Sequence, residues 1–283
     1  MDGNFVTLHS MNAKEQETDL RAQARNYRLG LQLESGLLRV VFSPVDGEAS
    51  LQQFSIPLDP TVPASRSLED AIYATPVLLA DYASIHATVV TDSFIPVPTG
   101  LVEDGVRLCG LEDEASGEAL LTDQPLDSME IAWTFDRTLY NFLKRTFRNC
   151  PVQCSLTPLV QFFSAKALRG NTGKLFVHFH GTAPRRMDLM AFSADGRPLL
   201  VTTKRYTVEA DALYYILAAM ETTGLSRTED EIQMCGDSAA RDALMPLLRR
   251  YVRFAVPVIF PSEAFKMGRE ALQAPFPLIV NCI

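Results

Sequence analysis

Two histidines separated by one residue form the most distinctive candidate site in the sequence. His178 and His180 fall at the end of a segment with strand periodicity, and side chains two apart on a strand share a face. Metal sites use this spacing, so a metal-dependent hydrolase built on both imidazoles is one hypothesis. The following residues, Thr182, Ala183 and Pro184, offer no further ligand. The pattern therefore favours a polar strand end near a domain interface, and we assign no metal and no cofactor from it.

The five cysteines form no second candidate metal site. Cys150 and Cys154 have a spacing that could bind a metal on a helix, but Pro151 between them disfavours a helix. A tetrahedral site would also need a second pair of ligands, and no second cysteine pair is present. An odd cysteine count in a chain of this length indicates reduced thiols and predicts a cytoplasmic location. The first residues also lack the basic start and apolar segment of a signal peptide.

Composition and missing motifs exclude several function classes. The net charge is −8 and the Lys and Arg residues are scattered, which predicts no nucleic-acid partner. No stretch approaches the roughly 20 apolar residues that a membrane span needs. The sequence has no Gly-x-Ser-x-Gly, no Gly-x-x-x-x-Gly-Lys-Ser/Thr and no Gly-x-Gly-x-x-Gly. Serine hydrolase, P-loop and dinucleotide-binding chemistry therefore have no sequence support.

The hydrophobic pattern predicts an α/β protein whose two halves repeat one another. Each half reads strand, turn, strand, Asp-Gly turn, strand, helix, strand, with Asp46-Gly47 and Asp195-Gly196 at matching turns. Residues 96–127 of the first half have no clear period and are interpreted as loop-rich. A glycine-rich segment, residues 169–173, is the best boundary. We therefore predict a lead-in over 1–26, a first half over 27–169 and a second half over 170–283 with a proline-rich tail.

The duplicated β-β-β-α-β-α plan resembles the actin-like ATPase (ribonuclease H-like) fold with two domains. More closely, the chain is similar to a family of uncharacterised bacterial proteins of that fold. The resembling segments are Arg205-Tyr206, the helical stretch Asp211-Ala212-Leu213-Tyr214-Tyr215-Ile216-Leu217, and Cys235-Gly236-Asp237. This resemblance implies a cleft between the halves, where three loops of the superfamily bind a nucleotide.

The phosphate loops that the resemblance points to have lost much of the superfamily's pattern. The first hairpin turn reads Glu34-Ser35-Gly36, with Leu38 where a hydroxyl residue is usual. At the second, His178 replaces the carboxylate, and a neutral imidazole is a poor Mg²⁺ ligand. The third loop reads Cys235-Gly236-Asp237-Ser238, so one glycine of the superfamily's Gly-Gly turn is missing and an acid is present in addition. The remaining candidates for nucleotide binding are listed in chain order: Glu34, Gly36, Gly181, Thr182, Gly236, Asp237 and Ser238.

Three hypotheses follow for function. The leading one is a non-catalytic member of the fold that acts as an interaction or assembly module with an unknown protein partner. The second is a nucleotide-binding ATPase or phosphotransferase that uses Glu34 in place of aspartate. The third is the metal-dependent hydrolase described above. The sequence does not fix the oligomeric state. The apolar tail around residues 274–280 is expected to pack on the protein's own core rather than on a partner.

Overall fold

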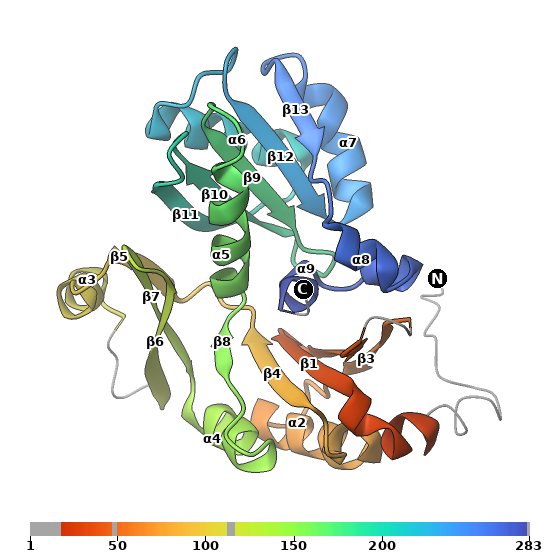
Figure 1. Cartoon of the computed structure of the whole chain (residues 1–283). Coiled ribbons are helices and arrows are strands. Elements are labelled where there is room, and N and C mark those ends of the chain that lie inside the picture. The colour runs from red at the N-terminus through yellow and green to blue at the C-terminus, as the bar shows by residue number, and fades with distance from the viewer. Residues whose placement is uncertain (1–17, 47–49, 112–116, 282–283) are drawn as a thin grey trace.

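The computed structural model describes residues 18–46, 50–111 and 117–281. The chain forms two five-stranded mixed sheets with helices packed on them, one sheet in each lobe of the molecule (Figure 1). Their strand orders are β3-β2-β1-β4-β8 and β11-β10-β9-β12-β13. Each order places the first strand of its half at the centre, with a meander on one side and parallel strands on the other. The duplicated α/β fold predicted from the sequence is therefore confirmed.

The first sheet opens with an antiparallel meander that continues into parallel strands. β1 pairs antiparallel with β2 and parallel with β4. The helices pack on this sheet through buried residues such as Leu68 and Ile72. The elements of this half, without its insert, are η1 (Ala24–Asn26), β1 (Tyr27–Glu34), β2 (Leu37–Pro44), β3 (Gln52–Pro57), α2 (Ala64–Tyr73), η2 (Pro76–Leu79), β4 (Ser84–Val89), α4 (Arg137–Thr146), β8 (Val152–Cys154) and α5 (Leu156–Ala167).

The second sheet repeats this pairing. β9 pairs antiparallel with β10 and parallel with β12. Its helix-covered face packs Leu175, Val177 and Phe179 against α6 and α7. The elements of this half are β9 (Lys174–Phe179), β10 (Arg186–Phe192), β11 (Pro198–Arg205), α6 (Glu209–Thr223), β12 (Glu231–Gly236), α7 (Ser238–Leu248), β13 (Phe254–Pro257), α8 (Ser262–Lys266), η4 (Arg269–Leu272) and α9 (Phe276–Val280).

An insert between β4 and α4 distinguishes the first half from the second. It consists of β5 (Phe94–Pro98), α3 (Val102–Cys109), β6 (Glu118–Leu126) and β7 (Met129–Asp136), and its strands form a separate sheet in the order β5-β7-β6. The interpretation of residues 96–127 as loop-rich was therefore wrong. Exposed and partly buried positions alternate along β6, but the residue types do not follow this alternation. Leu120 is exposed, Asp123 is partly buried and Pro125 is buried, so the apolar pattern did not reveal the strand.

The C-terminal tail packs on the protein's own core, as predicted. α9 contacts α5 and β1, and the ring of its Phe276 lies 6.2 Å from the ring of His178 on β9, so the tail lies between the two five-stranded sheets (Figure 1). Phe276, Leu278 and Ile279 are buried. A Cβ atom on Gly30 of β1 would lie 3.4 Å from the Leu278 side chain, so glycine lets the tail approach the first sheet closely. Across the described residues, we find no helix with the length and hydrophobicity needed to span a membrane.

Candidate functional site

The tips of two hairpins meet where the two lobes face each other. Glu34 is the last residue of β1, and Thr182 lies in the loop between β9 and β10. The Thr182 hydroxyl donates a hydrogen bond of 2.5 Å to Oε2 of Glu34. The two turns predicted as phosphate loops from the resemblance to the actin-like fold are thus joined directly to each other.

The other oxygen of Glu34 is also engaged by protein donors. Nε2 of Gln32 donates to Oε1 at 2.7 Å, and Nε of Arg39 donates to the same atom at 2.8 Å. Burial of Glu34 opposes its ionisation, but the hydrogen bond from Thr182 and the charge of Arg39 outweigh it and lower the pKa of this carboxyl. Glu34 is therefore an ionised carboxylate whose two oxygens are committed to three side chains of the protein.

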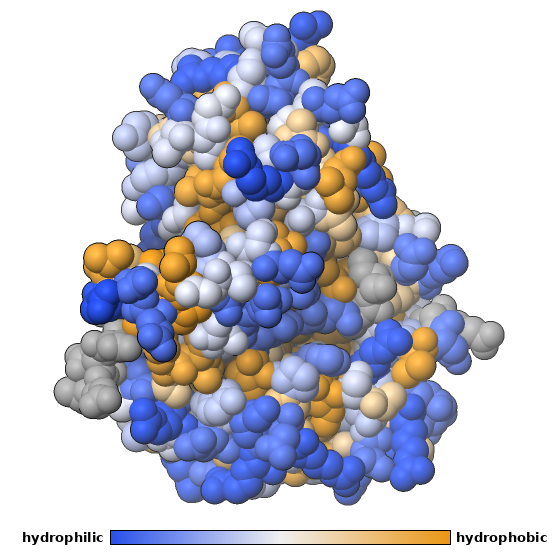
Figure 2. Space-filling model, turned by 60° about the vertical axis from the view of Figure 1, so that its left-hand side comes forward, coloured by the Kyte–Doolittle hydropathy of each residue, from blue (hydrophilic) through white to orange (hydrophobic). Residues whose placement is uncertain are grey.

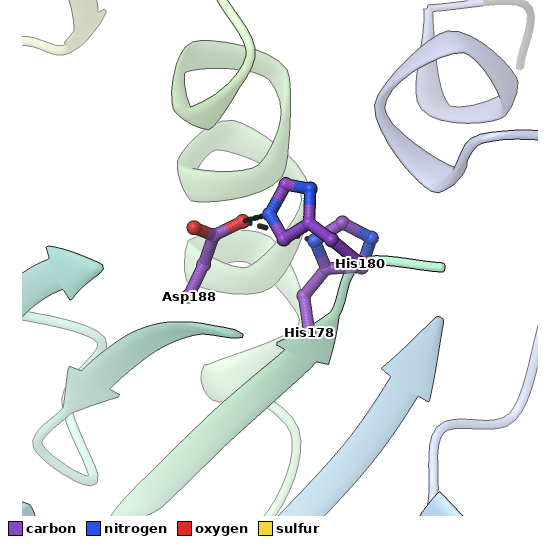
Figure 3. A group of neighbouring side chains, drawn as sticks. All are labelled: His178, His180 and Asp188. Carbon is purple, nitrogen blue, oxygen red and sulfur yellow. Dashed lines mark hydrogen bonds and ion pairs between the residues drawn. The ribbon is translucent and has the colours of Figure 1, made fainter. Parts of the chain in front are cut away.

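The second hairpin carries a buried group of two histidines and one acid (Figure 3). His178 and His180 point to the same side, and Asp188 lies opposite His178 on β10. Nδ1 of His178 is 2.9 Å, and Nε2 of His180 is 2.7 Å, from the same Oδ2 atom of Asp188. All three side chains are buried. The described part of the chain contains no other group of three such residues close enough to hold a metal ion.

Burial sets the protonation of this group. Burial lowers the pKa of His178 and outweighs the opposing effect of its hydrogen bond with Asp188, so the imidazole is neutral at pH 7. Burial also opposes the ionisation of Asp188, but the nearby His180 and the hydrogen bonds with both imidazoles hold the pKa of this carboxyl well below its usual range. The second hairpin thus contains a buried anion, although it lacks the carboxylate expected at position 178.

The third predicted loop, residues 235–238, lies beside the second hairpin, and two of its residues have structural roles. Gly236 has φ +85°, and a Cβ there would lie 2.1 Å from the Phe179 carbonyl oxygen, so this position requires glycine. Asp237 is the N-cap of α7 and accepts a hydrogen bond from the amide of Ala240 at 2.8 Å. A Cβ on Gly181 would lie 3.6 Å from the Asp237 carboxylate. The acid gained in this loop therefore caps a helix.

A cleft of about 570 Å³ lies between these hairpins and the C-terminal tail. Thr182 is not part of the cleft wall, but its hydroxyl donates a hydrogen bond to Glu34, which is. Gly36 turns the β1–β2 hairpin with φ +73° and is not part of the wall. The wall contains the remaining five predicted residues: Glu34, Gly181, Gly236, Asp237 and Ser238.

Sequence reasoning missed three polar residues of this site. Gln32 and Arg39 line the cleft and hold Glu34, and Oε1 of Gln32 is buried with no hydrogen-bond partner. Asp188 was missed because its neighbours in the site come from another strand. The signal was present, since Asp188 is the one charged residue inside the apolar run 187–192, where a charge must be paired.

The tail fills one side of the cleft with hydrophobic side chains. The ring of Phe276 stacks on Phe163 at a centroid distance of 5.6 Å and lies 6.2 Å from the ring of His178. Phe260 and Phe265 also line the cleft. The space between the lobes is therefore polar at the hairpins and apolar at the tail.

The family described as "Protein of unknown function (DUF3822)" matches residues 15–254, most of the chain. The chain belongs to this family. No curated protein matches it. The DUF3822 match thus agrees with the resemblance inferred from the sequence, and it assigns no activity.

Two solved structures show the fold of this DUF3822 protein. A protein from Bacteroides thetaiotaomicron with actin-like ATPase fold and unknown function is 16% identical and has a TM-score of 0.74, covering 92% of this chain and 97% of that one. The PilM-PilN type IV pilus biogenesis complex contains a chain that is 12% identical with a TM-score of 0.52, covering 91% of this chain and 99% of that one. At these identities the similarity establishes the fold alone.

Proposed function

We propose that the protein is a non-catalytic member of the actin-like fold that acts as an interaction or assembly module. The observation that carries this proposal is the direct hydrogen bond between Thr182 and Glu34. It joins two loops that, in an ATPase of this fold, would have to receive phosphate and Mg²⁺ between them.

The chemistry of the two hairpins supports the same conclusion. An ATPase needs a carboxylate that is free to hold Mg²⁺ or to orient the attacking water. Both oxygens of Glu34 already accept hydrogen bonds from the protein. Neutral His178 replaces the carboxylate of the second hairpin, and Mg²⁺ prefers oxygen ligands. Catalysis would require the Glu34 network to be broken first.

The insert supports a role in protein interaction. Leu101 is 48% and Leu108 is 82% exposed, at the start and near the end of α3, and Leu120 on β6 is 42% exposed. In Figure 2 the left-hand flank of the molecule shows hydrophobic side chains gathered at the surface where the insert lies. A chain of this fold takes part in the two-protein PilM-PilN complex. We therefore propose the insert as the surface that contacts a partner protein.

Nucleotide binding without hydrolysis is the second candidate, and the cleft favours it. About 570 Å³ of space remains beside the hairpins, with Ser238 and Arg241 in its wall. The unpaired Oε1 atom of Gln32 could accept a hydrogen bond from a ligand there. A nucleotide in this cleft would meet Asp237, whose charge repels phosphate.

We further propose that the division between the two domains falls at residues 169–170, and that the protein is bacterial and cytoplasmic. The two sheets lie on either side of that position in the sequence. The four described cysteines are free thiols, as expected in a reducing compartment. The Bacteroides thetaiotaomicron protein supports a bacterial source.

Site-specific photo-crosslinking tests the interaction role. A photoreactive residue replaces Leu108 on the insert, and the matched control replaces Tyr214, which is 67% exposed on the second half. The proposal expects a discrete protein adduct from position 108 and none from position 214. Adducts of equal yield from both positions, or none from 108, would contradict the insert as the contact surface. The non-catalytic role would be contradicted if the wild-type protein released phosphate from Mg·ATP and Glu34→Gln abolished that release.

A further inference from the structure

The buried group on the β9–β10 hairpin has the donor set of a metal site (Figure 3). We propose that His178, His180 and Asp188 bind one divalent transition-metal ion, with Zn²⁺ the best match to their chemistry. This inference does not depend on the interaction role proposed above, because it rests on a different set of side chains.

Strand geometry brings the three donors together without help from loops. His178 and His180 alternate on one face, and the antiparallel register places Asp188 directly opposite His178. The three ligand atoms lie within 4.8 Å of one another. Zinc ligands at about 2.0–2.2 Å in a tetrahedral arrangement are separated by roughly 3.3–3.6 Å. The nitrogen-to-oxygen distances of 2.9 and 2.7 Å therefore need to open by about 0.4–0.9 Å to admit the ion.

The charge balance of the group also suits a cation. Asp188 is 1% exposed, and no Arg or Lys among the described side chains forms an ion pair with it. Buried charges in proteins are paired or coordinate metals. On binding, each imidazole would carry its proton on the ring nitrogen that faces away from the ion. The metal would then replace two hydrogen bonds with three coordinate bonds, one from each side chain, and compensate the buried carboxylate.

A second layer of contacts orients the carboxylate. Thr203, on β11 opposite Asp188, donates a hydrogen bond of 2.7 Å from its hydroxyl to Oδ1. This leaves Oδ2 facing the two imidazoles. The ring of Phe276 shields the group from the side of the tail. Outer contacts of this kind fix ligand geometry in known metal sites.

The donor types select the metal. Two imidazole nitrogens and one carboxylate oxygen are common zinc ligands, whereas Mg²⁺ and Ca²⁺ take oxygen ligands. Cys235 pairs in register with His178 on the neighbouring strand. Its thiol is not among the ligand atoms that lie within 4.8 Å of one another, so it does not belong to the donor set. Both histidines line the cleft, so a water molecule or a cleft ligand can take the fourth position.

Cobalt titration of the full chain tests the site. The protein is prepared without a histidine tag, stripped with a chelator, and titrated with Co²⁺ and then with competing Zn²⁺. We expect one equivalent of Co²⁺ per chain, with the visible absorption of a four-coordinate ion and no thiolate charge-transfer band. Zn²⁺ should displace the Co²⁺ and raise the melting temperature. A strong thiolate band would contradict the proposed donor set.

Matched variants locate the binding. His180→Gln and Asp188→Asn should abolish the cobalt spectrum, whereas His86→Gln, a histidine outside the group, should leave it unchanged. Thr203→Val should weaken binding by about 10- to 100-fold, as loss of an outer contact does. The proposal is overturned if the wild-type protein takes up no metal after equilibration with Zn²⁺, a result that does not depend on whether any variant folds. Wild-type affinity in His180→Gln would also overturn it.

Discussion

In the first half of the protein, the β1–β2 hairpin closes through Ser35 and Gly36, and its one acid is held by three neighbouring side chains. In the second half, the β9–β10 hairpin carries a longer loop over residues 180–185, and its acid lies on the returning strand between two imidazoles. Both hairpins occupy the same place in the same strand order. The buried cores thus preserve the duplicated topology, while the hairpin tips that face the cleft have acquired different chemistry.

The largest effect should come from the glycines of the two halves. Gly236→Ala places a Cβ 2.1 Å from the Phe179 carbonyl oxygen at φ +85°, whereas Gly36→Ala has φ +73° with nothing within 4 Å. We expect Gly236→Ala to cost about 2–5 kcal/mol of unfolding free energy through strain and overpacking, and Gly36→Ala only about 1–2 kcal/mol. Denaturant unfolding of both variants measures this, and equal costs would contradict the close approach of β12 to β9.

The contact between the halves can be broken at Glu34. Glu34→Gln removes a charged acceptor from Thr182 and Arg39, and should cost about 1–3 kcal/mol at pH 7. The pKa of Glu34 is lowered in the folded protein, so its stabilisation is present above the unfolded pKa of about 4.3 and is lost as the pH falls through the lower folded value.

Urea unfolding of the wild-type protein and Glu34→Gln between pH 7 and pH 3 measures that dependence. The gap between the two should be constant from pH 7 to about pH 5 and should narrow below about pH 4. Thr182→Val is the control, because it removes the hydrogen bond between the halves but keeps the Glu34 carboxylate. A gap that persists at pH 3 would mean that the ionised form of Glu34 is not what joins the halves.

The second hairpin can be loosened through Thr203. Thr203→Val removes the hydroxyl that donates to Asp188 and should lower the unfolding free energy of the metal-free protein by about 1–2 kcal/mol. Thr202→Val, at the neighbouring position on β11, is the matched control because its hydroxyl has no such role at Asp188. Chemical denaturation in the presence of a chelator measures both. Equal losses would show that Asp188 does not depend on its outer contact.

The smallest effect is expected on the insert. Leu108 is 82% exposed, so Leu108→Glu should change the unfolding free energy by no more than about 0.5 kcal/mol. The same substitution should reduce the crosslinked adduct formed by a photoreactive residue placed at Leu101, at the start of the same helix. Leu143→Ala on α4, a buried position, is the contrasting variant and should cost about 2–5 kcal/mol. A large loss of stability in Leu108→Glu would show that this side chain packs within the fold instead.

Much of the fold could be predicted because it depends on local patterns. Strand alternation and the Asp-Gly turns reveal the repeat, and the apolar tail indicates its own burial. The strand β6 of the insert could not be predicted because its residue types do not follow its burial: Leu120 is exposed, whereas Asp123 is partly buried and Pro125 is buried. Asp188 could not be predicted as a partner of His178 because their contact depends on the register between two strands. Spacing along the chain does not give that register. The bridge from Thr182 to Glu34 depends on how the two lobes approach each other.

Calorimetric titration of the purified protein with ATP and ADP in the presence of Mg²⁺ tests the central claim most directly. It measures binding itself, so an absent substrate or partner cannot mask the result. The account predicts no heat of binding for the wild-type protein, because Glu34 and Thr182 close the space between the hairpins. Micromolar binding of Mg·ATP with turnover that depends on Glu34 would contradict it.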